Sequence, residues 1–205
     1  MNYQWARDTV LQLIDQYSVA GERVSLSYNN QADYVAKIPG LLDDAQVYAA
    51  TTVRMIRKYV PLVQLEREVR GAFRIYALPG DCCRVSALVC FGGGEVRRSR
   101  DWHLLGNDYL AVGQSVGEDA LLQYCRRPVL LGSDPEDDAL LDNVLEVQMT
   151  LPYYAAAHLV MHDNAYAYQA LLNEWEMRLA RLAALPVAEM GITEDAYAVS
   201  SGGYV

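Results

Sequence analysis

The sequence predicts an α+β protein: a helical bundle of two N-terminal and two C-terminal helices, with a β-rich antiparallel insertion and an extended C-terminal tail. Apolar residues recur at helical spacing toward both ends, whereas the middle carries short apolar runs bounded by glycine, asparagine and aspartate. We therefore expect four parts: N-terminal helices over residues 1–60, the β-rich insertion over 61–131, C-terminal helices of the same bundle over 132–184 and the tail over 185–205.

The N-terminal helices are predicted from apolar side chains spaced by three and four residues. The first helix is expected over about 3–19, and its apolar stripe consists of Val10, Leu13, Ile14 and Tyr17. The second is expected to begin near Gln31, to be interrupted at Pro39–Gly40, and to continue its apolar face as far as Tyr59. Pro61 would end it, because proline lacks the backbone N–H that a helix needs.

The middle of the chain is predicted to form strands and hairpins. Turn signals such as Pro79–Gly80–Asp81 and Gly92–Gly93–Gly94 separate the apolar runs. The expected strands are 73–76, 84–91, 109–112 and 120–124.

Helices return near Pro152, since proline suits the first turn of a helix. The segment 153–161 is apolar nearly all round, which predicts a helix buried on several sides. Asp163 and Asn164 are expected to end it and to cap the next helix. The stripe of that last helix consists of Tyr168, Leu171, Leu172, Trp175, Leu179 and Leu182, with Glu174 and Arg178 as an ion pair on another face.

Composition excludes several classes of protein. Of the 205 residues, 52% are hydrophobic and 21% are charged, which argues against wholesale disorder. The net charge of −9 disfavours general affinity for nucleic-acid phosphates. We find no apolar run of the roughly 20 residues that span a bilayer, and we expect no secretion leader. The four cysteines, Cys82, Cys83, Cys90 and Cys125, lack zinc-site spacing and are expected to be thiols.

The best candidate for a metal site is His158 with His162, because a spacing of four places both imidazoles on one helical face. A zinc protease would need glutamate directly after the first histidine, and that residue is Leu159. Asp163 is too near His162 in sequence to complete the site. Two polar residues on a buried helix are the simpler interpretation.

The densest basic cluster is Arg97, Arg98 and Arg100, which we expect on a loop beside the glycine run 92–94. That run lacks the Lys-Ser/Thr of a phosphate-binding loop and is expected to be a hairpin tip. The arginines are a possible contact for a protein partner or DNA, although such a run is usually just solvated.

Several stretches together carry a family pattern: WARDTVLQLIDQYS, DYVAKIPGLLDDAQVYAATTVRMI, QYCRRPVLL and LPYYAAAHLVMHDNAYAYQALLNEWEMRLARL. With them, the chain resembles the head–tail adaptor (connector, or head-completion) proteins of tailed bacteriophages. The resemblance covers most of residues 1–184 and includes no catalytic motif. The large β-rich insertion departs from the compact, nearly all-helical adaptors.

The resemblance implies a structural, non-enzymatic virion protein of the head–tail junction, made in the host cytoplasm. Adaptors form a ring under the portal, commonly a dodecamer, extend the DNA channel and dock the stopper or tail. The implied partners are the portal protein, stopper or tail proteins, further copies of the chain, and genome DNA passing through the lumen without sequence-specific binding. Neither a cofactor, a metal nor a membrane is implied. An acidic chain also suits a channel wall that repels phosphate.

In related adaptors a C-terminal extension often inserts against the portal. Residues 187–205 are expected in that role and to order only on docking. Their apolar anchors would be Ile192, Tyr197, Val199, Tyr204 and Val205. Two other functions stay open: a tail-completion or stopper protein of the same neck region, and a metal-dependent hydrolase that uses His158 and His162.

Overall fold

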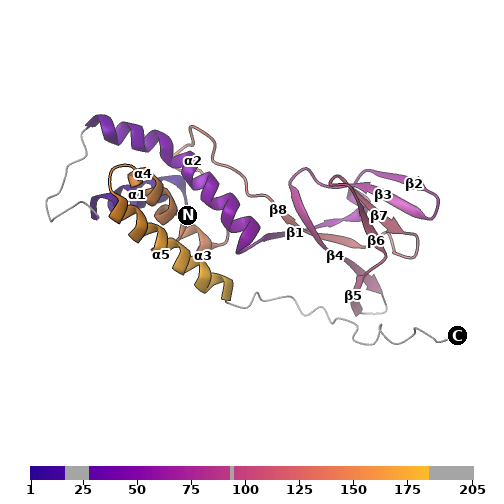
Figure 1. Cartoon of the computed structure of the whole chain (residues 1–205). Helices are drawn as coiled ribbons and strands as arrows, with labels where there is room; N and C mark the ends of the chain where they lie inside the picture. Colours follow the sequence, from indigo (N-terminus) through magenta and orange to yellow (C-terminus); the bar gives the residue numbers. More distant parts are fainter. Residues whose placement is uncertain (17–27, 93–94, 185–205) are drawn as a thin grey trace. The chain divides into compact units, whose positions relative to one another are not determined.

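The computed structural model describes residues 1–16, 28–92 and 95–184, and within them the fold is α+β, as predicted. Residues 1–56 and 127–184 of this part form a helical unit, and 57–126 form a β-rich unit (Figure 1). The helices are α1 (Tyr3–Gln16), α2 (Tyr28–Thr52), α3 (Leu145–Gln148), α4 (Leu151–Val160) and α5 (Ala165–Ala184).

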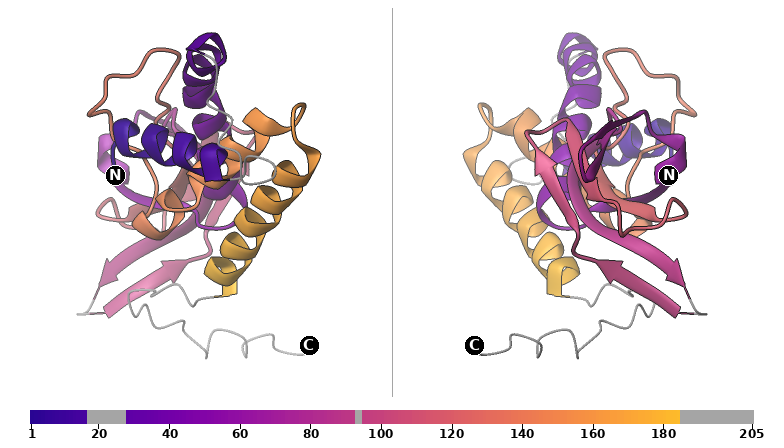
Figure 2. Two further views of the ribbon diagram at one scale, coloured as in Figure 1. Left: turned by 90° about the vertical axis from the view of Figure 1, so that its left-hand side faces the viewer. Right: turned by 90° about the vertical axis from the view of Figure 1, so that its right-hand side faces the viewer.

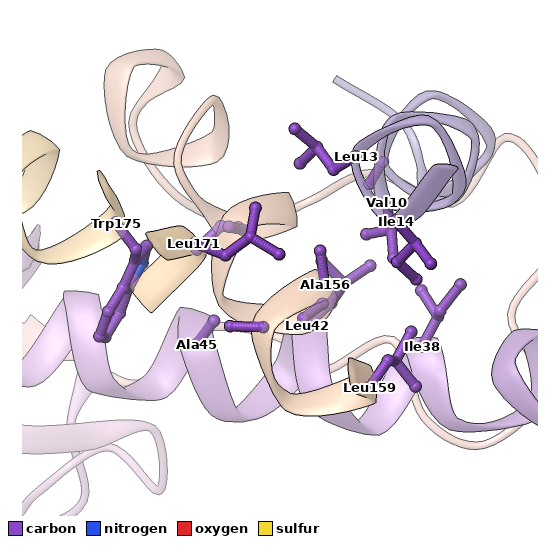
Figure 3. Packing of buried hydrophobic residues seen from close by; sticks show 14 of the residues in the cluster. Val10, Leu13, Ile14, Ile38, Leu42, Ala45, Ala156, Leu159, Leu171 and Trp175 are labelled. Atoms are coloured by element: carbon purple, nitrogen blue, oxygen red, sulfur yellow. The ribbon is translucent and has the colours of Figure 1, made fainter. Parts of the chain in front are cut away.

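Helix α4 lies at the centre of the helical unit, in contact with α1, α2 and α5. Its all-round apolar sequence is explained by this position, because every face of the helix meets another element. Ala155, Ala156 and Ala157 have no exposed surface, and their short side chains let the neighbouring helices approach closely. Figure 3 shows how side chains from α1, α2, α4 and α5 meet in this core.

Helix α2 differs from the prediction at both ends and in the middle. It begins at Tyr28, ahead of Gln31, and it runs through Pro39 without interruption. A proline inside a helix costs about 3 kcal/mol. Here Ile38 and Leu42, on either side of Pro39, are fully buried, and this packing offsets the lost hydrogen bond.

The expected extension of α2 to Tyr59 is wrong. The helix ends at Thr52, and the strand β1 (Ile56–Pro61) follows. β-Branched and aromatic residues such as Ile56, Tyr59 and Val60 favour a strand, which the helical spacing alone concealed. Pro61 therefore closes an edge strand, a position where a missing N–H is tolerated.

The C-terminal helices follow the prediction closely. Pro152 lies in the first turn of α4. Asn164 caps α5, since its Oδ1 accepts a hydrogen bond from the Ala167 N–H at 3.0 Å. Arg178 Nε donates to Glu174 Oε1 at 2.7 Å, which confirms the expected pair. The short helix α3 was not expected.

A buried polar network attaches the segment 127–144 to α2. The Asp43 carboxylate accepts hydrogen bonds from the backbone N–H groups of Leu131 at 2.8 Å and Gly132 at 3.0 Å. Gln46 Oε1 accepts from the Asp142 N–H at 2.7 Å, and Gln46 Nε2 donates to Asp43 at 3.1 Å. Asp43 and Gln46 thereby satisfy backbone groups that the irregular segment leaves without partners of its own.

The β-rich unit is built from two four-stranded sheets, with strand orders β1-β8-β4-β5 and β2-β3-β7-β6. After β1 and a 3-10 turn (Leu62–Gln64), the strands are β2 (Arg67–Arg70), β3 (Phe73–Ala77), β4 (Cys82–Gly92), β5 (Glu95–Ser99), β6 (Trp102–Leu105), β7 (Tyr109–Gly113) and β8 (Leu121–Arg126). The four expected strands are confirmed as β3, β4, β7 and β8, whereas β1, β2, β5 and β6 were missed.

The two sheets share one hydrophobic core. Tyr76, Leu110, Leu88, Leu122 and Tyr124, which are each at most 1% exposed, come from both sheets. Strands β4 and β5 pair antiparallel, with Gly92 opposite Glu95, and Figure 2 shows the two strands side by side. Gly93 and Gly94, expected at a hairpin tip, lie outside the described residues. The β4–β8 pairing has two irregularities, one between Cys82 and Arg84 and one between Val85 and Ala87.

Candidate interaction surface

The arginines that we expected on one loop lie on a strand and point in different directions. Arg97 and Arg98 are consecutive residues of β5, so their side chains lie on opposite faces of the sheet. Arg97 pairs with Glu95, its Nη2 lying 2.6 Å from Oε2. Arg100 follows the end of β5 and is exposed. The expected loop cluster is therefore wrong as geometry, and a contact role for Arg97, Arg98 and Arg100 stays a prediction.

Strand register places Arg98 on the outer face of the sheet β1-β8-β4-β5, away from the core. Arg98 pairs with Val89, whereas Ser99 pairs with the core residue Leu88. Arg84 pairs with Cys125, the neighbour of the core residue Tyr124, so Arg84 lies on the same outer face.

Arg57 on β1 completes this face. The adjacent Lys58 lies on the core side, because its Nζ is 5.9 Å from the ring centroid of the buried Tyr124. Alternation along β1 then turns Arg57 and Tyr59 outward. We call the side of this sheet with Arg57, Arg84 and Arg98 the basic outer face.

Lys58 is fixed on its side of β1 by a polar triad. Its Nζ lies 3.0 Å from Asp81 Oδ2, and Tyr124 Oη donates to Asp81 Oδ1 at 2.9 Å. Burial raises the pKa of Asp81, but the hydrogen bonds from Lys58 and Tyr124 outweigh it and hold that pKa below its ordinary value.

The basic outer face also carries apolar and amide groups. Tyr59, Phe91 and Val96 are exposed on it, with Phe91 at 45%. At its centre Gln123 is only 3% exposed, and its Oε1 has no hydrogen-bond partner among the described residues. Neither Gln123 nor the likewise buried Ala87 and Val89 belongs to the core between the sheets.

This face could be recognised only from strand register. Arg57, Arg84 and Arg98 are distant in the sequence, and none lies in a distinctive motif. The local density of arginine groups Arg98 with Arg97 in the sequence, although Arg97 lies on the opposite side of the sheet. A correct pairing of β4 with β5 and β8 would have separated them.

All four cysteines are thiols. Cys83 Sγ donates a hydrogen bond to the Cys125 carbonyl at 3.1 Å. Burial raises the pKa of Cys82 and Cys90 above the ordinary thiol value. Since the thiolate is the nucleophile and the metal ligand, this burial lowers the reactivity of both.

The two histidines do not share a helical face. His158 is on α4, where its Nδ1 lies 2.9 Å from the Tyr154 carbonyl and its ring lies 4.0 Å from that of Tyr154. Helix α4 ends at Val160, so His162 falls in the following turn and is exposed. The expected i, i+4 arrangement is therefore wrong, and the described part of the chain holds no group of three ligands suited to a metal ion.

The Asp163 carboxylate is hydrogen-bonded to a tyrosine. Its Oδ2 accepts a hydrogen bond from Tyr34 Oη of α2 at 2.7 Å. This contact joins the α4–α5 turn to α2, two segments that lie 129 residues apart in the chain.

The Tyr34–Asp163 contact predicts a pH dependence. The hydrogen bond to Asp163, aided by burial, raises the pKa of Tyr34 to about 12. The folded pKa exceeds the unfolded value of about 10, so the contribution to stability is complete below pH 10 and is lost as the pH rises toward 12. The difference in tyrosinate absorbance between wild type and Tyr34→Phe should titrate near pH 12. In the Asp163→Asn background, the same difference should titrate nearer pH 10. A wild-type difference that titrates near pH 10 would contradict this contact.

The tail residues expected to bind the portal, Ile192, Tyr197, Val199, Tyr204 and Val205, lie outside the described residues. The expected helix residues beyond Gln16, Tyr17 among them, also lie outside. Within the part that is described, every helix is too short or too polar to cross a membrane.

Comparison with known proteins gives structural likenesses only. The sequence matches no family model and no curated protein. Among solved structures, the chain is similar to a chain of one described as "Neck of empty GTA particle computed with C6 symmetry", with 13% identity and a TM-score of 0.26. The alignment covers 90% of this chain and 92% of that chain. At this identity and TM-score the likeness carries no argument about function.

Proposed function

We propose that the chain is a structural protein of the neck of a tailed-phage-like particle, and that it acts as the adaptor between portal and tail. Copies of the chain form a ring under the portal, extend the DNA channel and offer a docking surface to the stopper or tail protein. The DNA passes without sequence-specific contacts, and no catalytic group, cofactor or metal takes part.

One observation carries the proposal. The two helical stretches at the N-terminal end and the helical stretch at the C-terminal end, which resemble adaptor proteins, are separated by the whole β-rich unit in sequence, yet they fold around a single core. Helix α4, from the fourth stretch, contacts α1 from the first and α2 from the second. A shared core supports the interpretation that the resembling stretches together form an adaptor body, with the β-rich unit as an elaboration of it.

The surface of the helical unit supports an assembling protein. Large apolar side chains are exposed along the segment that connects β8 to α3 and at the start of α3, and they are Val129, Leu130, Leu140 and Leu145. Apolar side chains that gather in one exposed patch are typical of surfaces that a partner covers. We assign this segment to contacts between ring subunits or with the portal.

Cosedimentation with the cognate portal ring tests the proposal. The full chain should sediment with the portal, and a metal chelator or the His162→Ala variant should leave binding unchanged. Loss of binding on chelation would instead indicate a metal-dependent protein. A chain that never sediments with a portal competent for tail attachment would contradict the adaptor function.

A further inference from the structure

We propose that the acidic C-terminal segment, residues 187–205, docks onto the basic outer face of the sheet β1-β8-β4-β5 in the free protein. The proposal concerns the chain before it meets a portal, so its failure would leave the proposed function untouched.

The face and the segment carry opposite charge. The strands of the sheet place Arg57, Arg84 and Arg98 on the outer face, and they place no acidic side chain there. Residues 57–126 contain ten basic and eight acidic residues, although the whole chain has a net charge of −9. The segment 187–205 carries three acidic residues and no lysine or arginine. Opposite charge thus favours this segment over a second copy of the same face, which the like charge would repel.

The apolar and polar groups of the two partners also match. The face exposes Tyr59, Phe91 and Val96 between its arginines. The segment has apolar residues at Ile192, Tyr197 and Val199, next to its carboxylates Glu189, Glu194 and Asp195.

The segment is long enough to cross the sheet. Its 19 residues reach roughly 60 Å when extended, whereas four neighbouring strands span only about 15 Å. It can therefore cross all four strands and place its carboxylates near arginines on β1, β4 and β5.

Hydrogen exchange of the full-length protein, followed by mass spectrometry, tests the proposal. At low salt, peptides from 187–199 should exchange at least about tenfold more slowly than an unstructured chain. The triple variant Arg57→Gln, Arg84→Gln, Arg98→Gln should lose this protection, as should wild type at high salt, because screening weakens contacts between exposed charges. Unchanged exchange in β3 and β7 would show that the variant remains folded.

A matched control distinguishes the effect of this face from the effect of removing positive charge elsewhere in the β-rich unit. Arg67→Gln, Arg70→Gln, Arg97→Gln removes the same charge from β2 and from the opposite side of β5, and it should keep the segment protected. Cleavage after Glu189 and Glu194 by a glutamate-specific protease gives a second readout and should be faster only in the first triple variant. Free exchange of 187–199 in wild type, or equal effects of the two triple variants, would overturn the proposal. The proposal would also be overturned if the face became protected only at higher protein concentration while the segment exchanged freely. A second copy of the chain would then be the occupant.

Discussion

Replacement of Trp175 by alanine should lower the free energy of unfolding by about 3–5 kcal/mol, the range typical of a large aromatic removed from a core. Trp175 is 4% exposed on α5 and contacts aromatic rings from two other helices. Its ring centroid lies 4.8 Å from that of Tyr154 on α4 and 5.2 Å from that of Tyr48 on α2. The alanine variant leaves a cavity where these three helices meet, and helices cannot fully close around it.

Urea unfolding followed by circular dichroism measures this loss, because the helical signal does not depend on the tryptophan. Tyr166→Ala is the matched control, since Tyr166 is an aromatic residue of the same helix that is 82% exposed. Its variant should change stability by no more than about 0.5 kcal/mol. Equal effects of the two substitutions would contradict the packing of α5 against α2 and α4.

The second large effect is expected from Asp43→Ala. This substitution removes the acceptor of two backbone N–H groups in the segment 127–144 and of the buried Gln46 amide. Hydrogen bonds to a charged group contribute about 1.5–3 kcal/mol each, and the exposed Gly132 N–H can regain water. We therefore expect a loss of about 2–4 kcal/mol in the free energy of unfolding.

The neighbouring carboxylate provides the control for Asp43. Asp44 is exposed on the same helix, and Asp44→Ala should be nearly neutral in the same urea measurement. Hydrogen exchange should locate the effect, with faster exchange at Leu131 and Gly132 in Asp43→Ala alone. A stable Asp43→Ala variant with unchanged exchange there would show that this network does not hold the segment.

The helical core was predictable because its signal is periodic and long. Stripes such as Leu171, Trp175 and Leu179 repeat over several turns, and the structure buries them as expected. Helix boundaries were harder to predict. Pro39 was treated as a break although tertiary packing overrides its local cost, and the spacing of Met55 and Tyr59 continued a helical period by chance where β1 in fact begins.

Strands were found from sequence only where apolar runs were clear. The missed strands β1, β2 and β5 carry several charged residues each, because they lie at the edges of their sheets, and charge there discourages pairing with other chains. The basic outer face has no local signal in the sequence. Its three arginines come from β1, β4 and β5, and only the pairing of these strands brings them to one side.

Electron microscopy of the cognate portal ring mixed with the chain tests the central claim most directly, with the full-length protein compared to a variant truncated after Leu185. The account predicts a ring of added density under the portal with the full chain, and its loss on truncation if the tail is the docking element. Density that survives truncation would keep the adaptor function and move the contact to the helices or the β-rich unit. A competent portal that gains no density from the full chain would contradict the account.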